Sequence, residues 1–101
     1  MSGLTPVSVE EILALVGRVL EIAPEAVSPI GAGILVAVGR GVVTNSIRFA
    51  QLLGVAHALV LRECVALQQA GLIVITRRDE RTQRLFLDLT PAGQDLVARA
   101  G

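Results

Sequence analysis

The sequence contains no lysine and only one cysteine, and these absences restrict what the chain can do. Cys64 alone cannot form an internal disulfide or build a cysteine-cluster zinc site. Glycine, arginine or glutamate interrupts the apolar residues well before eighteen in a row, so no segment is long enough to span a bilayer. Residues 1–7 lack the basic start and apolar run of a secretory signal. We therefore expect a cytoplasmic protein without membrane contact.

Charge is balanced overall but unevenly distributed along the chain. The 101 residues fit one domain, and the 52 % hydrophobic fraction excludes a disordered chain. Residues 1–39 carry a net charge of −3, and residues 40–101 carry +3. All nine positive side chains are arginine, which suits bidentate contacts to phosphate and guanine. Compositional drift without a functional meaning explains the same distribution equally well.

The first helix is predicted from a capping box. Ser8 and Glu11 have the spacing in which each side chain bonds the other's backbone, and Pro24 ends the helix. One side of this helix is apolar, through Val9, Ile12, Leu13, Val16, Val19, Leu20 and Ala23. Leu15 and Ile22 make this stripe wider than one core contact requires. The surplus indicates either a partner subunit or packing over the helix's own domain, and both interpretations stay open.

Cap and turn residues divide the next segment. Ser28-Pro29 is typical of a helix start, and Gly39-Arg40-Gly41 ends the short apolar helix that follows. Residues 42–44 fit a short strand, and Thr44 or Asn45 can cap the next helix. The expected helices of this segment cover residues 30–38 and 46–53.

Residues 49–73 have the pattern of two crossed helices joined by a tight turn. Ala50 is small where the helices cross, Gly54 can adopt the left-handed conformation that ends the first helix, and Val55 fills the turn. The second helix, over 56–70, continues one buried stripe through Val60, Cys64 and Leu67. Cys64 is therefore expected in the core, where it packs as a small hydrophobe instead of acting as a redox switch. Such a helix pair presents its second helix to the DNA major groove.

A charged hairpin and a last helix complete the chain. Residues 73–76 and 85–89 are rich in branched and aromatic side chains and are predicted as strands. The segment between them, residues 77–84, is expected to form the hairpin tip and contains four arginines. Thr90-Pro91 then supplies a cap and a first-turn proline for the final helix.

Four features follow one another along the chain: the turn at Gly54, the segment Gly71-Leu72-Ile73, the arginine hairpin and the segment 89–93 (Leu-Thr-Pro-Ala-Gly). In this order they resemble the winged helix-turn-helix regulators of the MarR and PadR families. The resemblance covers residues 42–97. It implies a mainly α fold with a small antiparallel β wing. Residues 1–27 are then an N-terminal helix and a possible dimerisation arm, and residues 28–101 are the winged helix-turn-helix domain. A homodimer is expected, because small regulators read two symmetry-related half-sites of double-stranded DNA.

In such regulators the second helix reads base edges, and the wing arginines contact the minor groove or phosphates. The candidate DNA-binding residues carried over by position are Asn45, Arg48, His57, Leu59, Arg62, Arg77, Arg78, Arg81 and Arg84. We expect His57 to be surface-exposed and, with Arg62, to be the strong polar reader of bases. We expect no metal, no cofactor and no catalysis, since the sequence lacks a metal-ligand cluster and a nucleophile–base arrangement.

The second helix departs from the family pattern because its outer face is apolar, at Ala56, Leu59, Leu61 and Val65. Leucine cannot hydrogen-bond a base, and Ala56 caps the helix only weakly. Such a face is typical of a protein contact, or else DNA affinity rests mainly on the wing and on phosphates. The first hypothesis is therefore a DNA-binding transcription regulator, a repressor. The alternative is a winged-helix module that contacts another protein through this apolar face.

Overall fold

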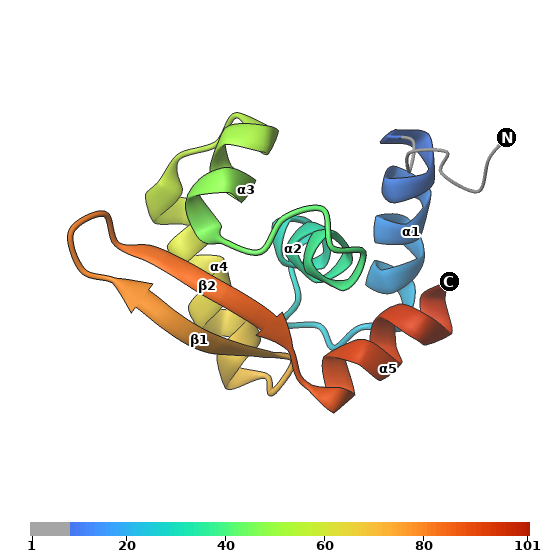
Figure 1. Cartoon of the computed structure of the whole chain (residues 1–101). Coiled ribbons are helices and arrows are strands. Elements are labelled where there is room, and N and C mark those ends of the chain that lie inside the picture. The colour runs from blue at the N-terminus through green and yellow to red at the C-terminus, as the bar shows by residue number, and fades with distance from the viewer. Residues whose placement is uncertain (1–8) are drawn as a thin grey trace, which may run out of the picture.

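The computed structural model describes residues 9–101, which form five helices and one two-stranded antiparallel sheet (Figure 1). In chain order the elements are α1 (Val9–Ile22), α2 (Pro29–Gly39), α3 (Ser46–Leu53), α4 (His57–Gln69), β1 (Ile73–Asp79), β2 (Arg84–Leu89) and α5 (Pro91–Ala100). Figure 1 shows α2 at the centre, with α1 and α5 on one side and α3, α4 and the hairpin on the other. The expectation of a mainly helical chain with a small antiparallel sheet is confirmed.

Three helices begin at the side-chain caps that the sequence indicates. The Ser28 and Thr90 hydroxyls accept hydrogen bonds from the third residue of α2 and of α5, at 3.0 and 3.1 Å. Of the two candidates for α3, Asn45 is the cap, and its Oδ1 accepts from the Arg48 N–H at 2.9 Å. These bonds satisfy backbone donors that have no partner within the helix. The cap expected at Ser8 lies outside the described residues.

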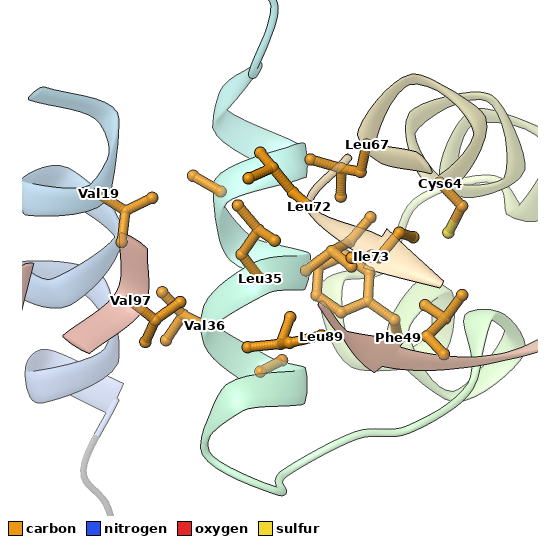
Figure 2. Close-up of a cluster of buried hydrophobic side chains, with 14 of the residues drawn as sticks. Val19, Leu35, Val36, Phe49, Cys64, Leu67, Leu72, Ile73, Leu89 and Val97 are labelled. Atoms are coloured by element: carbon orange, nitrogen blue, oxygen red, sulfur yellow. The ribbon is translucent and has the colours of Figure 1, made fainter. Parts of the chain in front are cut away.

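The core is organised around α2, whose buried face covers nearly its whole circumference. Ala32, Ile34, Leu35 and Val36 are fully buried. Figure 2 shows why: Val36 points toward Val19 of α1 and Val97 of α5, whereas Leu35 lies on the side of Leu72 and Ile73. A helix that is apolar all round is stable only when other elements cover it on every side. α2 therefore holds the two halves of the fold together.

The buried face of α1 differs from the expected one. Leu15 and Val19 are 2 % and 0 % exposed, whereas Leu13, which we expected on the core side, is 64 % exposed. The reason is that α1 packs against both α2 and α5. Its buried line therefore faces the groove between these two helices, and that line runs through Leu15 and Val19. Leu13 and Ile22 remain as exposed apolar residues.

The two strands of the hairpin are longer than the sequence indicated, and the loop between them is shorter. Pairing runs from Ile73 opposite Leu89 to Asp79 opposite Arg84, with an irregularity between Ile75 and Arg77. Three of the four arginines expected at the tip therefore lie on strands, and only Arg81 lies in the connecting loop. The short strand expected at 42–44 is absent from the described fold. A single bridge joins Asn45 to Phe86 instead, and the Leu87 N–H donates to the Thr44 carbonyl at 2.8 Å.

The start of α5 is docked closely on the turn that follows α4. The Thr90 hydroxyl donates to the Gly71 carbonyl at 2.6 Å, and the Thr90 N–H donates to the Leu72 carbonyl at 3.1 Å. A Cβ on Gly93 would overlap this Leu72 oxygen and lie 3.1 Å from the Leu72 carbonyl carbon. Glycine is therefore required at position 93, because any side chain would push α5 away from this turn.

Candidate nucleic-acid interface

The turn between α3 and α4 has the geometry that the sequence predicted. Gly54 has φ +68°, a left-handed conformation that costs glycine nothing, and the Val55 N–H donates to the Ala50 carbonyl at 3.1 Å. Ala50 is buried, and Val55 is half-buried in the turn. Val60, Cys64 and Leu67 of α4 face the core. The opposite face of α4, which includes Arg62, is therefore exposed.

The starts of α3 and α4 meet the start of β2 at one place, which we call the junction: Asn45, Ser46, His57, Arg84 and Leu85. Asn45 bridges to the residue after Leu85. Ser46 accepts a hydrogen bond from the Leu85 N–H at 2.9 Å, and its Oγ lies 2.8 Å from His57 Nε2. The positive ends of two helix dipoles therefore lie beside the arginine-rich strands.

Most of the candidate arginines are free to bind an anion. Arg48, Arg62, Arg77, Arg78 and Arg81 are exposed. Within residues 9–101 none of them pairs with a carboxylate, and the ion pair that the structure does show, Arg99 with Asp95, lies on α5. The Arg77 guanidinium lies 4.3 Å from the centre of the Phe86 ring, a stacked position that holds it against the hairpin while leaving its donors available.

Arg84 is less accessible than we expected. It is half-buried. Within residues 9–101 its Nε is a buried side-chain atom that has no hydrogen-bond partner. Arg84 lies close enough to His57 to act on it electrostatically. Its cation therefore belongs to the junction as much as to the outer surface of the hairpin.

The loop at the end of the hairpin is held by its own polar groups. The Asp79 carboxylate accepts from the Arg81 N–H at 3.0 Å, and the Gln83 amide donates to the Glu80 carbonyl at 2.9 Å. Gln83 adopts a left-handed conformation, with φ +62°. Asp79 therefore orders the loop that presents Arg81. Residues 77–84 keep a net charge of +2.

Two sequence-predicted site residues prove to have structural partners. His57 is half-buried and one of its ring nitrogens is bonded to Ser46, so it is less exposed than we expected. Burial and then the nearby Arg84 cation lower its pKa from 6.5. Asn45 is half-buried too, and its side-chain oxygen is occupied as the cap of α3. Only its amide nitrogen is left for a ligand.

The apolar face of α4 is smaller than the sequence suggested. Leu59 and Leu61 are half-buried, and Leu61 packs against the core. Val65 remains exposed, at 41 %. The reason is that α3, α2 and β1 all pack on α4 and together cover more of its circumference than one buried stripe. Ala56 makes no side-chain cap hydrogen bond, as expected, and the Leu59 N–H donates to the Ala56 carbonyl at 3.1 Å instead.

Sequence reasoning missed Ser46 as a member of the site. Ser46 is polar but has no exposed surface. Its hydroxyl joins α3, α4 and β2. A serine at the first position of a helix is ordinary in sequence. Nothing in the pattern shows that strand β2 and His57 come within hydrogen-bond distance of it.

The described residues also bear on a metal site and on a reactive cysteine. Residues 9–101 contain no cluster of histidine, cysteine and acidic side chains that could hold a metal ion. Cys64 is fully buried, and burial, followed by the nearby Glu63 carboxylate, raises the pKa of its thiol to about 11. A neutral, inaccessible thiol is a poor nucleophile. Cys64 therefore packs as a core residue.

An apolar groove lies away from the junction, between α1, α2 and α3. Its volume is about 280 Å³. It includes four of the exposed large apolar residues, Leu13, Val42, Leu52 and Leu53. The groove supplies apolar contact area but no polar group that could orient a substrate.

Comparison of the chain with protein-family models, with curated proteins and with solved structures finds no match. None of the helices in the described part of the chain is long and apolar enough to cross a membrane. A functional assignment therefore depends on the geometry of the junction, of α4 and of the hairpin.

Proposed function

We propose that this chain is a winged helix-turn-helix transcription regulator, a repressor, that binds double-stranded DNA with α4 as its recognition helix and the β1–β2 hairpin as its wing. The observation that carries the proposal is the gathering of five exposed arginines, unpaired within residues 9–101, on α3, α4 and the hairpin, beside the starts of two helices. In Figure 1 these elements lie together at the end of the molecule opposite α1 and α5.

Each group has a role that its chemistry fits. The open start of α4 enters the major groove, where Arg62 donates two hydrogen bonds to a guanine edge. Arg48, in the first turn of α3, contacts a phosphate. Arg77, Arg78 and Arg81 extend along the hairpin and contact the adjacent phosphates or minor groove. Base contacts through Arg62 give sequence preference, and the phosphate contacts give affinity that is common to all sequences.

The zero net charge of the chain is compatible with this function because the charges are separated in space. The acidic α1 packs against α2 and α5, whereas the arginines lie on α3, α4 and the hairpin. Phosphate neutralisation depends on the local arginines, since charges farther away than about 8–10 Å are screened at physiological salt.

The first test measures duplex affinity as a function of salt. A duplex selected from a random pool and an unrelated duplex are titrated with the protein between 50 and 300 mM salt. Replacing Arg78 and Arg81 together by alanine is expected to weaken binding to both duplexes and to reduce the slope of log K against log salt by about 2, about one per phosphate contact. Arg99→Ala, on α5, is the matched control and is expected to change neither affinity nor slope.

The second test separates base readout from phosphate binding. Arg62→Ala is expected to cost about 1–3 kcal/mol on the selected duplex and much less on the unrelated one. Equal losses on both duplexes would contradict the role assigned to Arg62. Failure of the pool to enrich any sequence, together with no duplex binding at moderate salt, would contradict the regulator itself and favour the protein-contact module.

The structure gives less support to that alternative than the sequence did. A docking face built from Leu59, Leu61 and Val65 needs all three to be exposed, but the first two are half-buried. The exposed Val65 by itself is an ordinary surface feature. DNA binding is therefore the function that the geometry favours.

We also propose that the protein is a homodimer that uses α1. The exposed Leu13, which lines the apolar groove between α1, α2 and α3, is apolar surface that an isologous contact with a second copy would cover. Sedimentation velocity of the untagged protein tests this: Leu13→Glu is expected to give a monomer at concentrations where the unmodified chain is a dimer. Val74→Glu, an exposed apolar residue on β1, is the control and should leave the dimer intact. A wild-type monomer at 100 μM would overturn the dimer.

A further inference from the structure

The hydroxyl of Ser46 makes two hydrogen bonds in a site with no access to water. Its side chain has no exposed surface. The Leu85 N–H donates to Oγ at 2.9 Å, and Oγ lies 2.8 Å from His57 Nε2. The structure gives Ser46 Oγ no further partner among residues 9–101.

These contacts decide where the protons are. A backbone N–H can only donate, so Oγ must accept from Leu85. The one hydroxyl hydrogen of Ser46 then needs an acceptor, because a buried donor without one is costly. His57 Nε2 is the acceptor in reach, and it accepts only when it carries no hydrogen. A neutral imidazole that has a bare Nε2 carries its proton on Nδ1.

The other ring nitrogen faces outward. His57 Nδ1 has no hydrogen-bond partner within residues 9–101. It is also not a buried polar atom without a partner, since within residues 9–101 that description applies to Arg84 Nε. Nδ1 therefore reaches the protein surface at the first residue of α4, beside N–H groups that Ala56 leaves uncapped.

We propose that Ser46 is a positioning residue that fixes His57 as a neutral imidazole protonated on Nδ1, so that this N–H donates to an acceptor atom of the bound duplex. The first half of this inference, the protonation state of His57, concerns the free protein alone. The second half, the contact with DNA, rests on the proposed function. His57 then reads a hydrogen-bond acceptor and is not a cation that attracts phosphate.

The surrounding charges favour the same form. Arg84 of β2 is the cation that acts on the ring, and the only charged residue of α3 is Arg48. On α4 itself the nearest charged residues, Arg62 and Glu63, lie more than one turn away, and Glu63 accepts a hydrogen bond from Ser28. β1, which also packs on α4, carries Arg77, Arg78 and Asp79 at its hairpin end. Protonation of Nε2 would make it a second donor to Ser46 Oγ, besides the Leu85 N–H. It would also place the imidazolium cation of His57 beside the Arg84 cation.

The first half is tested on the free protein by nitrogen-15 NMR. His57 is the only histidine of the chain, so its ring signals need no assignment in the untagged protein. At pH 7.5 Nδ1 is expected to show the chemical shift of a protonated nitrogen and Nε2 that of a bare one. Ser46→Ala is expected to return the ring to the Nε2–H form that free histidine favours in water, and Ser46→Thr to restore the wild-type spectrum. A wild-type ring protonated on Nε2 would overturn the inference without any variant.

The second half is tested on the selected duplex at constant salt. His57→Ala is expected to lower affinity about three- to tenfold, the effect of one hydrogen bond. Between pH 8 and 6 the wild-type affinity should change less than that of Ser46→Ala, whose histidine is free to protonate near a phosphate. Unchanged affinity in His57→Ala would overturn the contact to DNA. If the protein binds no duplex, the proposed function fails together with this contact, whereas the Nδ1–H form seen by NMR would stand.

Discussion

Replacement of Gly93 by alanine tests how α5 is fixed to the rest of the fold. Gly93 is a buried residue in the first turn of α5. The added methyl group would overlap the Leu72 carbonyl oxygen, which also accepts the Thr90 N–H at 3.1 Å. The start of α5 must then move away by about 1.5 Å to restore an ordinary contact distance. That movement breaks the Thr90 N–H bond to the Leu72 carbonyl.

The expected magnitude follows from two destabilising effects and one stabilising effect. Overpacking against backbone costs about 1–3 kcal/mol. Loss of the bond to Leu72 costs about 1 kcal/mol. The better helix propensity of alanine offsets at most about 1 kcal/mol. We expect a net loss of about 1–3 kcal/mol in the free energy of unfolding, which lowers Tm by about 5–20 °C in a domain of this size.

The assay is urea and thermal unfolding followed by circular dichroism, with Gly17→Ala as the matched control. Gly17 lies inside α1, and a Cβ there meets no atom within 4 Å. The same substitution is therefore expected to stabilise the protein by about 0.5–1 kcal/mol. If Gly93→Ala is as stable as the wild type while Gly17→Ala behaves as expected, the close approach of α5 to Leu72 is wrong.

Three further predictions concern single side chains. Thr90→Val removes the cap of α5 and the bond to Gly71, so we expect it to lower the free energy of unfolding by about 1–2 kcal/mol in urea, with Thr90→Ser close to wild type. Cys64 is buried with its thiol pKa raised to about 11, so a disulfide reagent at pH 8 should label the native chain at least about a thousandfold more slowly than the urea-unfolded chain; rapid native labelling would contradict its burial. The pKa of His57 is lowered from 6.5, so the unfolded chain binds the proton first as the pH falls, and the free energy of unfolding should decrease below about pH 6.5. His57→Gln should show a shallower decrease over that range, and parallel curves for the two proteins would refute the lowered pKa.

Much of the fold was predictable because local interactions specify it. Ser28, Asn45 and Thr90 cap helices with bonds that span three residues, and Gly54 ends α3 by its own conformational freedom. The bounds of α3 agreed with expectation for that reason. The buried stripe of α4 followed from helical periodicity alone. Each of these signals requires nothing beyond the neighbouring residues.

The errors arose where several elements compete for one surface. Periodicity placed Leu13 of α1 on the core side, but the direction of the buried face depended on where α2 and α5 lie. It likewise left Leu59 and Leu61 exposed, because the pattern does not show that three elements cover α4. The loop at the hairpin tip was predicted too long, because charged residues that pair across two strands have the composition of a loop.

The candidate site divides in the same way. Sequence alone determined that arginines concentrate around the α3–α4 pair and the hairpin, because charge and chain order are properties of the sequence itself. Only the tertiary structure decided that Ser46, His57 and Arg84, which belong to three different elements, meet at one point. A hydrogen bond depends on distances between atoms far apart in the chain, and those distances exist only after the core around α2 has packed.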